Sequence, residues 1–312
     1  MQLRRSTFLA AVPTIALVAR PAAAQVQTLR IGATANDTYA EAYYAQDMGF
    51  FTKAGLTVEI STFANGAAIS AGVASGALDI GVSNPVQLAN AVVRGIPFVY
   101  IAGGALNSTA APTAVLCVAA NSPIKDARDL IGKTIAISAL KDSTYLAAST
   151  YLTKNGIDLA SVHLIELPFA EMGAALQRGT VAAAVVSEPS VTRALIAGQV
   201  RVFTKIFDSI ASSFMISGWF TTADWYRKNG ALAKRFAGAV YDSARWANAH
   251  HEQSAAILQK YAQLDAETTR RMTRCTYTVA LDAQAIDPLL ALAGQAKLTD
   301  RPVTAAEMIA PS

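Results

Sequence analysis

Short apolar runs alternate with amphipathic stretches along most of the chain, and polar loops separate them. The clearest example lies at residues 133–156. There the β-branched and small residues 134–137 predict a buried strand, and the polar loop 138–142 follows it. Asp142, Ser143 and Thr144 are good N-cap residues for a helix that runs to Lys154 and is closed by Gly156. This arrangement directs free backbone N–H groups toward the end of a sheet, where a polar or anionic ligand group can bind.

The same alternation predicts the other elements of the chain. The expected strands cover residues 28–33, 56–62, 78–82, 96–102, 113–119, 162–167, 181–186 and 200–204. The expected helices between them cover residues 40–53, 65–75, a segment from Pro85 onward, 126–131, 169–178 and a segment up to Ala197, with a loop at 103–110. After an apolar segment at 214–221 only helices are expected, at 231–249, 254–262, 266–275 and 282–296. Strands that alternate with helices are typical of a mostly parallel sheet covered by helices.

This order predicts an α/β chain with two lobes and a helical C-terminal tail. We expect a signal peptide at 1–24, a first lobe at 25–115, a second lobe at 116–213, and a return to the first lobe with C-terminal helices at 214–312. The segments near 113–119 and 214–220 are the expected hinges. Ligands of open α/β sheets bind beyond the carboxyl ends of the strands, so the loops there are expected to line one cleft.

Those loops are rich in Asn, Ser and Thr, which are uncharged hydrogen-bonding residues. The candidate ligand-binding residues, with the aromatic residues nearby, are Asn36, Asp37, Tyr39, Asn65, Ser83, Asn84, Asn107, Ser108, Ser143, Thr144, Tyr145, Glu188 and Phe214. Each has a purely structural alternative, since Ser143 and Thr144 also suit a helix cap and Asn36 and Asp37 also suit a turn. Glu188 suits the first turn of a helix, and Tyr39 suits a core position.

The first 24 residues have the pattern of a signal peptide. Arg4 and Arg5 precede an apolar run at 8–19, and Ala22–Ala24 form a cleavage site before Gln25. The run is too short to span a bilayer, and no Cys lies at the cleavage point to carry a lipid. The two arginines resemble a twin-arginine signal, but Phe8 lies one residue too far along, which favours general secretion. We therefore expect a periplasmic mature chain.

Composition narrows the possible partners. The chain has 312 residues, of which 53% are hydrophobic and 15% are charged, which is ample for a packed core. The net charge of +4 falls to +1 without the leader, because the leader holds three arginines and no acidic residue. Without runs of Lys or Arg, nucleic acid is not an expected partner. Cys117 and Cys275 are either a disulfide of an exported protein or two buried, unpaired thiols, and the second alternative is favoured.

The search for catalytic and metal-binding motifs is negative. The sequence contains no G-x-S-x-G, no H-E-x-x-H and no Cys–His arrangement suggested by spacing. His250 and His251 are adjacent, so on a helix they point about 100° apart and lack the spacing of a zinc helix. We predict no catalytic residue, no metal site and no cofactor.

Five segments resemble, in the same order, segments of periplasmic solute-binding proteins for nitrate, sulfonates and taurine. They lie at 49–60, 75–83, 121–138, 167–189 and 286–309 and together span essentially the whole mature chain. The resemblance implies a two-lobed periplasmic-binding-protein fold of type II that closes on its ligand by hinge motion. It also implies a monomeric substrate-binding component that delivers a small polar organic molecule or anion to an ABC permease. The same family includes binding proteins for pyrimidine precursors of thiamine.

The chain departs from this family where the ligand is expected. Asp142-Ser143 stands where the family often has Gly-Ser, and Lys141 is the one cation in loops that also hold Asp37 and Glu188. A strongly anionic ligand usually requires a guanidinium group, so the loops favour a neutral, zwitterionic or amine-bearing molecule. Two alternatives remain: a receptor for a sensor kinase or chemoreceptor, and an enzyme like the fungal thiamine-pyrimidine synthases, whose Cys-rich signature is absent here.

Overall fold

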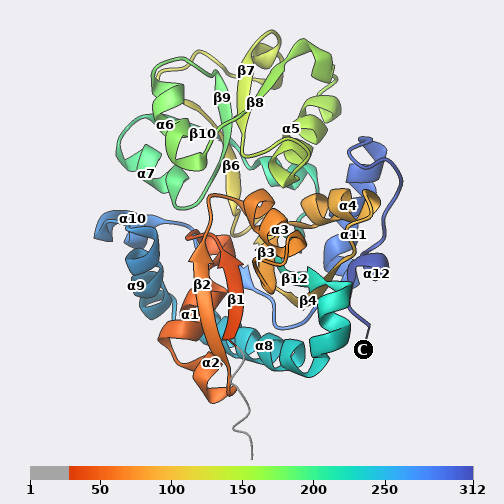
Figure 1. Ribbon diagram of the computed structural model, residues 1–312. Helices are drawn as coiled ribbons and strands as arrows, with labels where there is room; N and C mark the ends of the chain where they lie inside the picture. Colours follow the sequence, from red (N-terminus) through yellow and green to blue (C-terminus); the bar gives the residue numbers. More distant parts are fainter. Residues whose placement is uncertain (1–27, 312) are drawn as a thin grey trace, which may run out of the picture.

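The computed structural model describes residues 28–311, so the predicted signal peptide and its cleavage site lie outside the described residues. Two α/β lobes, each built on a five-stranded sheet, lie one above the other in Figure 1. The strand order is β2-β1-β3-β12-β4 in the first sheet and β10-β6-β9-β7-β8 in the second. The predicted two-lobed fold is confirmed.

The first lobe forms from the early part of the chain and one returning strand. Its strands are β1 Thr28–Ala33, β2 Thr57–Thr62, β3 Ile80–Ser83, β4 Phe98–Gly103 and β12 Gly218–Thr222. Its helices are η1 Asp37–Tyr39, α1 Glu41–Asp47, α2 Phe50–Lys53, α3 Gly66–Ala74 and α4 Pro85–Val93. Strands β1, β2 and β3 are parallel, whereas β12 runs antiparallel to both β3 and β4. The carboxyl ends of the parallel strands face the second lobe (Figure 1).

The second lobe repeats the same plan. Its strands are β6 Ala114–Ala119, β7 Thr134–Ile137, β8 His163–Glu166, β9 Ala183–Ser187 and β10 Val200–Thr204. Its helices are η2 Ala127–Leu130, α5 Ser143–Lys154, η3 Leu159–Ser161, α6 Phe169–Gln177, α7 Ser190–Ile196 and η4 Ile206–Ser209. Strand β7 is parallel to β8 and β9, whereas β6 is antiparallel to β9 and β10.

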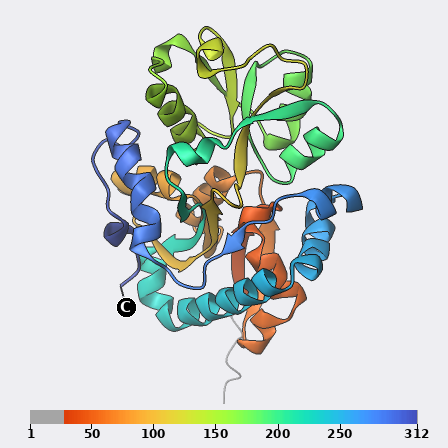
Figure 2. The same cartoon turned by 180° about the vertical axis from the view of Figure 1, so that it is seen from behind.

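The C-terminal part wraps the first lobe, as the rear view in Figure 2 shows. Its elements are α8 Ala223–Ala249, α9 His251–Ala262, α10 Ala266–Arg271, β13 Thr276–Tyr277, α11 Ala283–Gln295 and α12 Ala305–Met308. Helix α8 packs against α1 and β4, and α11 packs against α4 and also reaches α5 of the second lobe. None of the described helices combines the length and the apolar character needed to cross a membrane.

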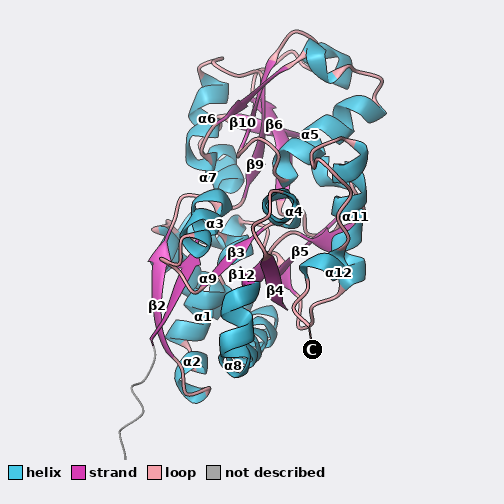
Figure 3. Ribbon diagram, turned by 45° about the vertical axis from the view of Figure 1, so that its right-hand side comes forward, coloured by secondary structure: helices cyan, strands magenta, loops and turns pink. Residues whose placement is uncertain are grey.

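Several expected elements differ in the structure. The expected loop at 103–110 contains β5 Ala105–Ser108 (Figure 3), which pairs with β11 Ser213–Met215 and with β13 in a small third sheet. The expected apolar segment at 214–221 is therefore divided between β11 and β12, which belong to different sheets. The helix expected to end at Cys275 stops at Arg271, because the following residues pair with β5.

Two helix boundaries also differ. The helix expected at 40–53 is divided into α1 and α2 at Gly49, whose φ of +72° lies in the left-handed region that favours glycine. Helix α8 begins eight residues earlier than expected, since the Thr222 hydroxyl accepts a bond of 3.1 Å from the Trp225 N–H and caps it. Both cysteines are buried free thiols, as the favoured alternative predicts.

The core of the first lobe contains a carboxylic acid. Glu41 on α1 is fully buried, and its Oε2 accepts a hydrogen bond of 2.9 Å from the Trp219 indole. Its Oε1 has no hydrogen-bond partner among the described residues. Burial raises the pKa of Glu41 well above its ordinary value of 4.5, and the indole lowers it by less. The folded chain therefore retains this proton to higher pH than the unfolded chain does.

Because the folded chain retains the Glu41 proton, we predict that its free energy of unfolding depends on pH. An acidic group whose pKa is raised by folding contributes its full stabilisation of the folded state at a pH below its unfolded pKa. That contribution is lost as the pH rises above 4.5 toward the pKa of the folded state. The wild type should lose up to about 1.4 kcal/mol of unfolding free energy per pH unit relative to Glu41→Gln. Urea unfolding from pH 4 to pH 8 measures the difference, and Glu252→Gln at an exposed position is the control. Parallel pH profiles for wild type and Glu41→Gln would contradict the assignment.

Candidate ligand-binding site

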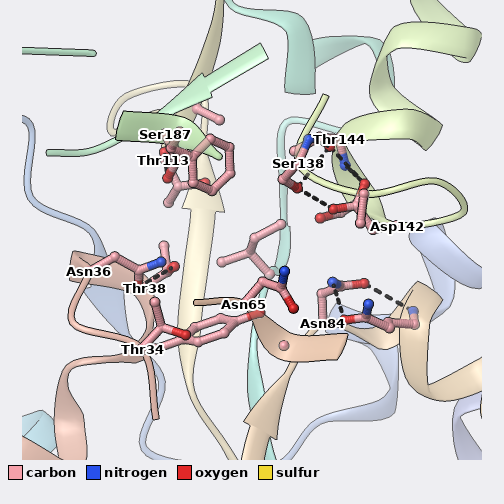
Figure 4. A pocket seen from close by; sticks show the side chains of 18 of the residues that line it. Thr34, Asn36, Thr38, Asn65, Asn84, Thr113, Ser138, Asp142, Thr144 and Ser187 are labelled. Atoms are coloured by element: carbon pink, nitrogen blue, oxygen red, sulfur yellow. Dashed lines mark hydrogen bonds between the residues drawn. The ribbon is translucent and has the colours of Figure 1, made fainter. Parts of the chain in front are cut away.

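A cavity lies between the two lobes, near the carboxyl ends of their parallel strands (Figure 4). The empty space between its lining atoms is about 600 Å³ with the open mouth included, a size suited to a small molecule. Six of the predicted residues line it: Asn36, Tyr39, Asn65, Asn84, Ser143 and Thr144. Further lining residues that the sequence analysis did not include among its candidates are Thr34, Thr38, Gln87, Thr113, Ser138, Asp142, Phe169, Ser187, Phe207 and Ile216.

The first lobe presents the amino-terminal ends of α3 and α4 to this cavity. Asn65 Oδ1 accepts a bond of 3.0 Å from the Ala68 N–H, and Asn84 Oδ1 accepts one of 3.0 Å from the Gln87 N–H. Each cap binds a single N–H group in the first turn of its helix. In α3 the earlier N–H group of Gly66 therefore remains available to an acceptor atom. The Thr34 hydroxyl is also buried without a partner among the described residues. This side of the cavity therefore suits a ligand oxygen.

The second lobe presents the carboxylate that caps α5. Asp142 Oδ1 accepts bonds from the Thr144 N–H at 2.8 Å, the Thr144 hydroxyl at 2.7 Å and the Tyr145 N–H at 2.9 Å. Its Oδ2 accepts a hydrogen bond from the Ser138 hydroxyl (Figure 4). Asp142 is 4% exposed, and burial raises its pKa although these hydrogen bonds act to lower it. Because Oδ2 has one partner where Oδ1 has three, it can accept another N–H group.

Asp142 is the one charged side chain among the described residues that line the cavity. Lys141, the cation expected at the mouth, is exposed and does not line the cavity. The cavity therefore combines one carboxylate with neutral amides, hydroxyls and helix amino termini. The described residues contain no cluster of three or more His, Cys, Asp or Glu side chains that could hold a metal ion.

Two predicted acidic residues are directed away from the cavity. Asp37 pairs with Arg274, with 2.6 Å between Oδ1 and Nε, and accepts a bond of 2.6 Å from the Cys275 N–H. Glu188 accepts bonds of 2.8 Å from the Thr192 hydroxyl and 3.1 Å from the Thr273 N–H. Because both carboxylates have partners within the protein, the structure corrects the expectation that they add negative charge to the ligand site.

The other five predicted residues also lie outside the cavity lining. Ser83 is buried and donates to Gln87 at 2.9 Å, whereas Asn107 accepts bonds of 3.0 and 3.1 Å from Thr113. Both therefore support lining residues from behind. Ser108 holds the turn after β5, Tyr145 lines a separate groove between α5 and α11, and Phe214 packs against Phe207 with ring centroids 5.5 Å apart. The orientation of each of these side chains depends on the strand or helix face that carries it, and the pattern of loops in the sequence does not predict that face.

A family model described as NMT1/THI5 like matches residues 36–254, which is more than two thirds of the chain. The chain belongs to the NMT1/THI5-like family. The resemblance found in the sequence is thereby confirmed. The matched region contains both five-stranded sheets apart from strand β1, together with nearly all of the cavity lining, from Asn36 to Ile216.

Two curated relatives from Escherichia coli K12 are each 27% identical to this NMT1/THI5-like chain. The first, a putative aliphatic sulfonates-binding protein, matches over 191 residues, which is 61% of this chain and 58% of the relative. The second, a taurine-binding periplasmic protein, matches over 241 residues, which is 77% of this chain and 71% of the relative. The matched part of the chain thus spans less than two thirds of the first relative's length.

Solved structures share the fold over nearly the whole chain. The periplasmic aliphatic sulphonate binding protein SsuA from Escherichia coli has a TM-score of 0.73 at 23% identity, and the match covers 91% of this chain and 97% of SsuA. The periplasmic nitrate-binding protein NrtA from Synechocystis has a TM-score of 0.69 at 17% identity over 80% of this chain and 69% of NrtA. The desulfurization enzyme DSZB matches with a TM-score of 0.69 at 15% identity over 91% of this chain and 96% of DSZB. At these identities the structures show the fold alone.

Proposed function

We propose that this chain is the periplasmic substrate-binding component of an ABC importer, which binds a small polar molecule between its lobes and delivers it to a permease. The observation that carries the proposal is the cavity itself, where hydrogen-bonding groups from both lobes converge on one site. The named functions of the sulfonate and taurine relatives agree with it. A ligand that touches both lobes favours the closed arrangement by its differential affinity, and the permease then recognises the closed form.

In this proposal the chain acts as an exported monomer, without a cofactor and without turnover. The described residues up to Ser108 and from Ser213 onward move as one lobe, and residues 114–209, which include all of β6, move as the other. The hinge is the pair of segments that join β5 to β6 and η4 to β11. The binding-protein relatives support a non-enzymatic role, whereas conversion of a bound compound would favour an enzyme, as DSZB is named.

The ligand in this proposal is neutral, zwitterionic or amine-bearing. An N–H or ammonium group meets Asp142 Oδ2, and a carbonyl or acidic oxygen meets the amino terminus of α3 near Gly66 and Thr34. A simple anion such as sulfate would face the Asp142 carboxylate with no Lys or Arg in the lining to offset the repulsion. A zwitterion satisfies both ends of the cavity at once.

A thermal-shift screen of the ligand-stripped mature chain tests the function. The panel holds taurine and other zwitterions, amines, pyrimidines, alkanesulfonates, nitrate and sulfate. A compound at about 100 times its dissociation constant adds roughly 2.7 kcal/mol, which raises the melting temperature by several degrees. We expect hits among zwitterions, amines or pyrimidines. Hits confined to sulfate, nitrate or alkanesulfonates would overturn the ligand class, and the absence of any hit would count against the receptor.

A further inference from the structure

The two lobes are joined by direct hydrogen bonds on both sides of the cavity. On one side the Thr273 N–H, between α10 and β13, donates to Glu188 Oε1 of the second lobe at 3.1 Å. On the other side Asn90 Nδ2 of α4 donates to the Lys141 carbonyl before α5 at 3.2 Å. Figure 1 shows the two sides, with α7 and α10 at the left and α4 and α5 at the right. These bonds exist only while the lobes are close together.

The Glu188 carboxylate is the stronger of these two connections. It lies between β9 and α7, is 6% exposed and does not line the cavity. Thr192 of its own lobe donates to it from its hydroxyl at 2.8 Å and from its N–H at 3.2 Å, which fixes the carboxylate beside the other lobe. A hydrogen bond to a charged group contributes more than a neutral one, and leaving that group partly unpaired is costly.

The segment that meets Glu188 is connected to the cavity floor. Arg274 and Cys275, which follow Thr273 directly, are both bound to Asp37 at 2.6 Å. Asp37 in turn lies between Asn36 and Thr38, whose side chains line the cavity (Figure 4). The position of Thr273 is therefore fixed by the same carboxylate that fixes this part of the ligand site.

We propose that Glu188 is a positioning residue that holds the second lobe on the Thr273–Cys275 segment in the closed conformation, and so sets the residence time of the ligand without touching it. The inference rests on the proposed function, because it assumes that the lobes open to release a ligand. It does not depend on which ligand binds. Breaking the bond lowers the closed population, which speeds dissociation and raises the dissociation constant, while association changes little.

The test compares Glu188→Ala with Glu171→Ala, an exposed acidic residue of the same lobe that serves as the matched control. The probe is taurine, and the first panel compound that raises the wild-type melting temperature replaces it if taurine does not bind. Stopped-flow measurements give the dissociation and association rates, and NMR hydrogen exchange gives the protection of the Thr273 amide. We expect the probe to dissociate at least about 10-fold faster from Glu188→Ala than from the control, with an unchanged association rate. The Thr273 amide should lose its protection in this variant.

Two further variants test the same contact if Glu188→Ala folds poorly. Glu188→Gln retains an acceptor for the Thr273 N–H and should recover most of the residence time, whereas Thr192→Val removes only the hydroxyl donor within the second lobe. The amide of Thr273 should stay protected in both. A dissociation rate for Glu188→Ala within twofold of the Glu171→Ala control, or an unprotected Thr273 amide in the wild-type complex, would overturn the positioning role of Glu188. Failure of every compound to bind the wild type would refute the proposed function instead, and Thr273 exchange in the ligand-free chain would still report on the contact.

Discussion

Arg274→Met is expected to lower the free energy of unfolding by about 3–5 kcal/mol, the largest effect on stability that we expect from a single substitution. The Arg274 and Asp37 side chains are only 10% and 2% exposed, and 2.6 Å separates Nε from Oδ1. Arg274 Nη2 also donates to the Tyr44 hydroxyl at 2.8 Å. Without the guanidinium, the Asp37 carboxylate stays buried with an uncompensated charge, which costs far more than the pair contributes.

Urea denaturation at pH 7 measures this loss, and Arg271→Met is the matched control. Arg271 pairs with Glu267 on the surface of α10, where the two side chains are 54% and 50% exposed, so its loss should cost no more than about 0.5 kcal/mol. The double variant Asp37→Asn/Arg274→Met should recover part of the stability, because it removes both charges. A loss below about 1 kcal/mol for Arg274→Met would show that the pair is not buried as described.

Asp142→Asn is expected to weaken binding of an amine or zwitterion about 10-fold to 100-fold, while the chain remains almost as stable as the wild type. Asparagine is as good an N-cap as aspartate, so the end of α5 is preserved. What is lost is the charge at Oδ2, and a hydrogen bond to a charged group contributes about 1.5–3 kcal/mol. Titration calorimetry of wild type and variant with a hit from the panel measures the change.

The matched control for this variant is Asp158→Asn. Asp158 also caps a helical turn, where its Oδ1 accepts a bond of 3.0 Å from the Ala160 N–H, but it lies outside the cavity lining. Its replacement should leave affinity unchanged. If Asp142→Asn leaves the affinity for the hit unchanged as well, Asp142 does not contact the ligand, and the ligand class derived from it is wrong.

The alternating elements were accessible from sequence because their signals are local. The apolar run at 134–137 and the cap at Asp142 appear in the structure as β7 and the start of α5, and Pro85 opens α4 as expected. The loops at the strand ends were also found, and they supplied six of the residues that line the cavity. Apolar lining residues such as Phe169 and Phe207 carry no local signal that separates them from the core.

The direction of individual side chains could not be predicted from the sequence, because the residues that they bind lie far away along the chain. Asp37 faces Arg274, 237 positions later, and Glu188 faces Thr273, 85 positions later, so both leave the cavity that their loops border. Strand β13 has two residues and forms only because β5 is beside it, and no periodicity is visible over so short a segment. These directions matter for the proposed function, since they leave Asp142 as the one charged side chain among the described residues that line the cavity.

Small-angle X-ray scattering of the ligand-stripped mature chain, titrated with a panel compound that raises its melting temperature, measures whether the two lobes close on a ligand. We expect an expanded ligand-free chain that compacts in proportion to the fraction bound, with one compound per chain, because the ligand bridges two lobes that meet around it. A compound that binds tightly while the radius of gyration stays unchanged would contradict closure between the lobes, and with it the delivery of a ligand by a closed form.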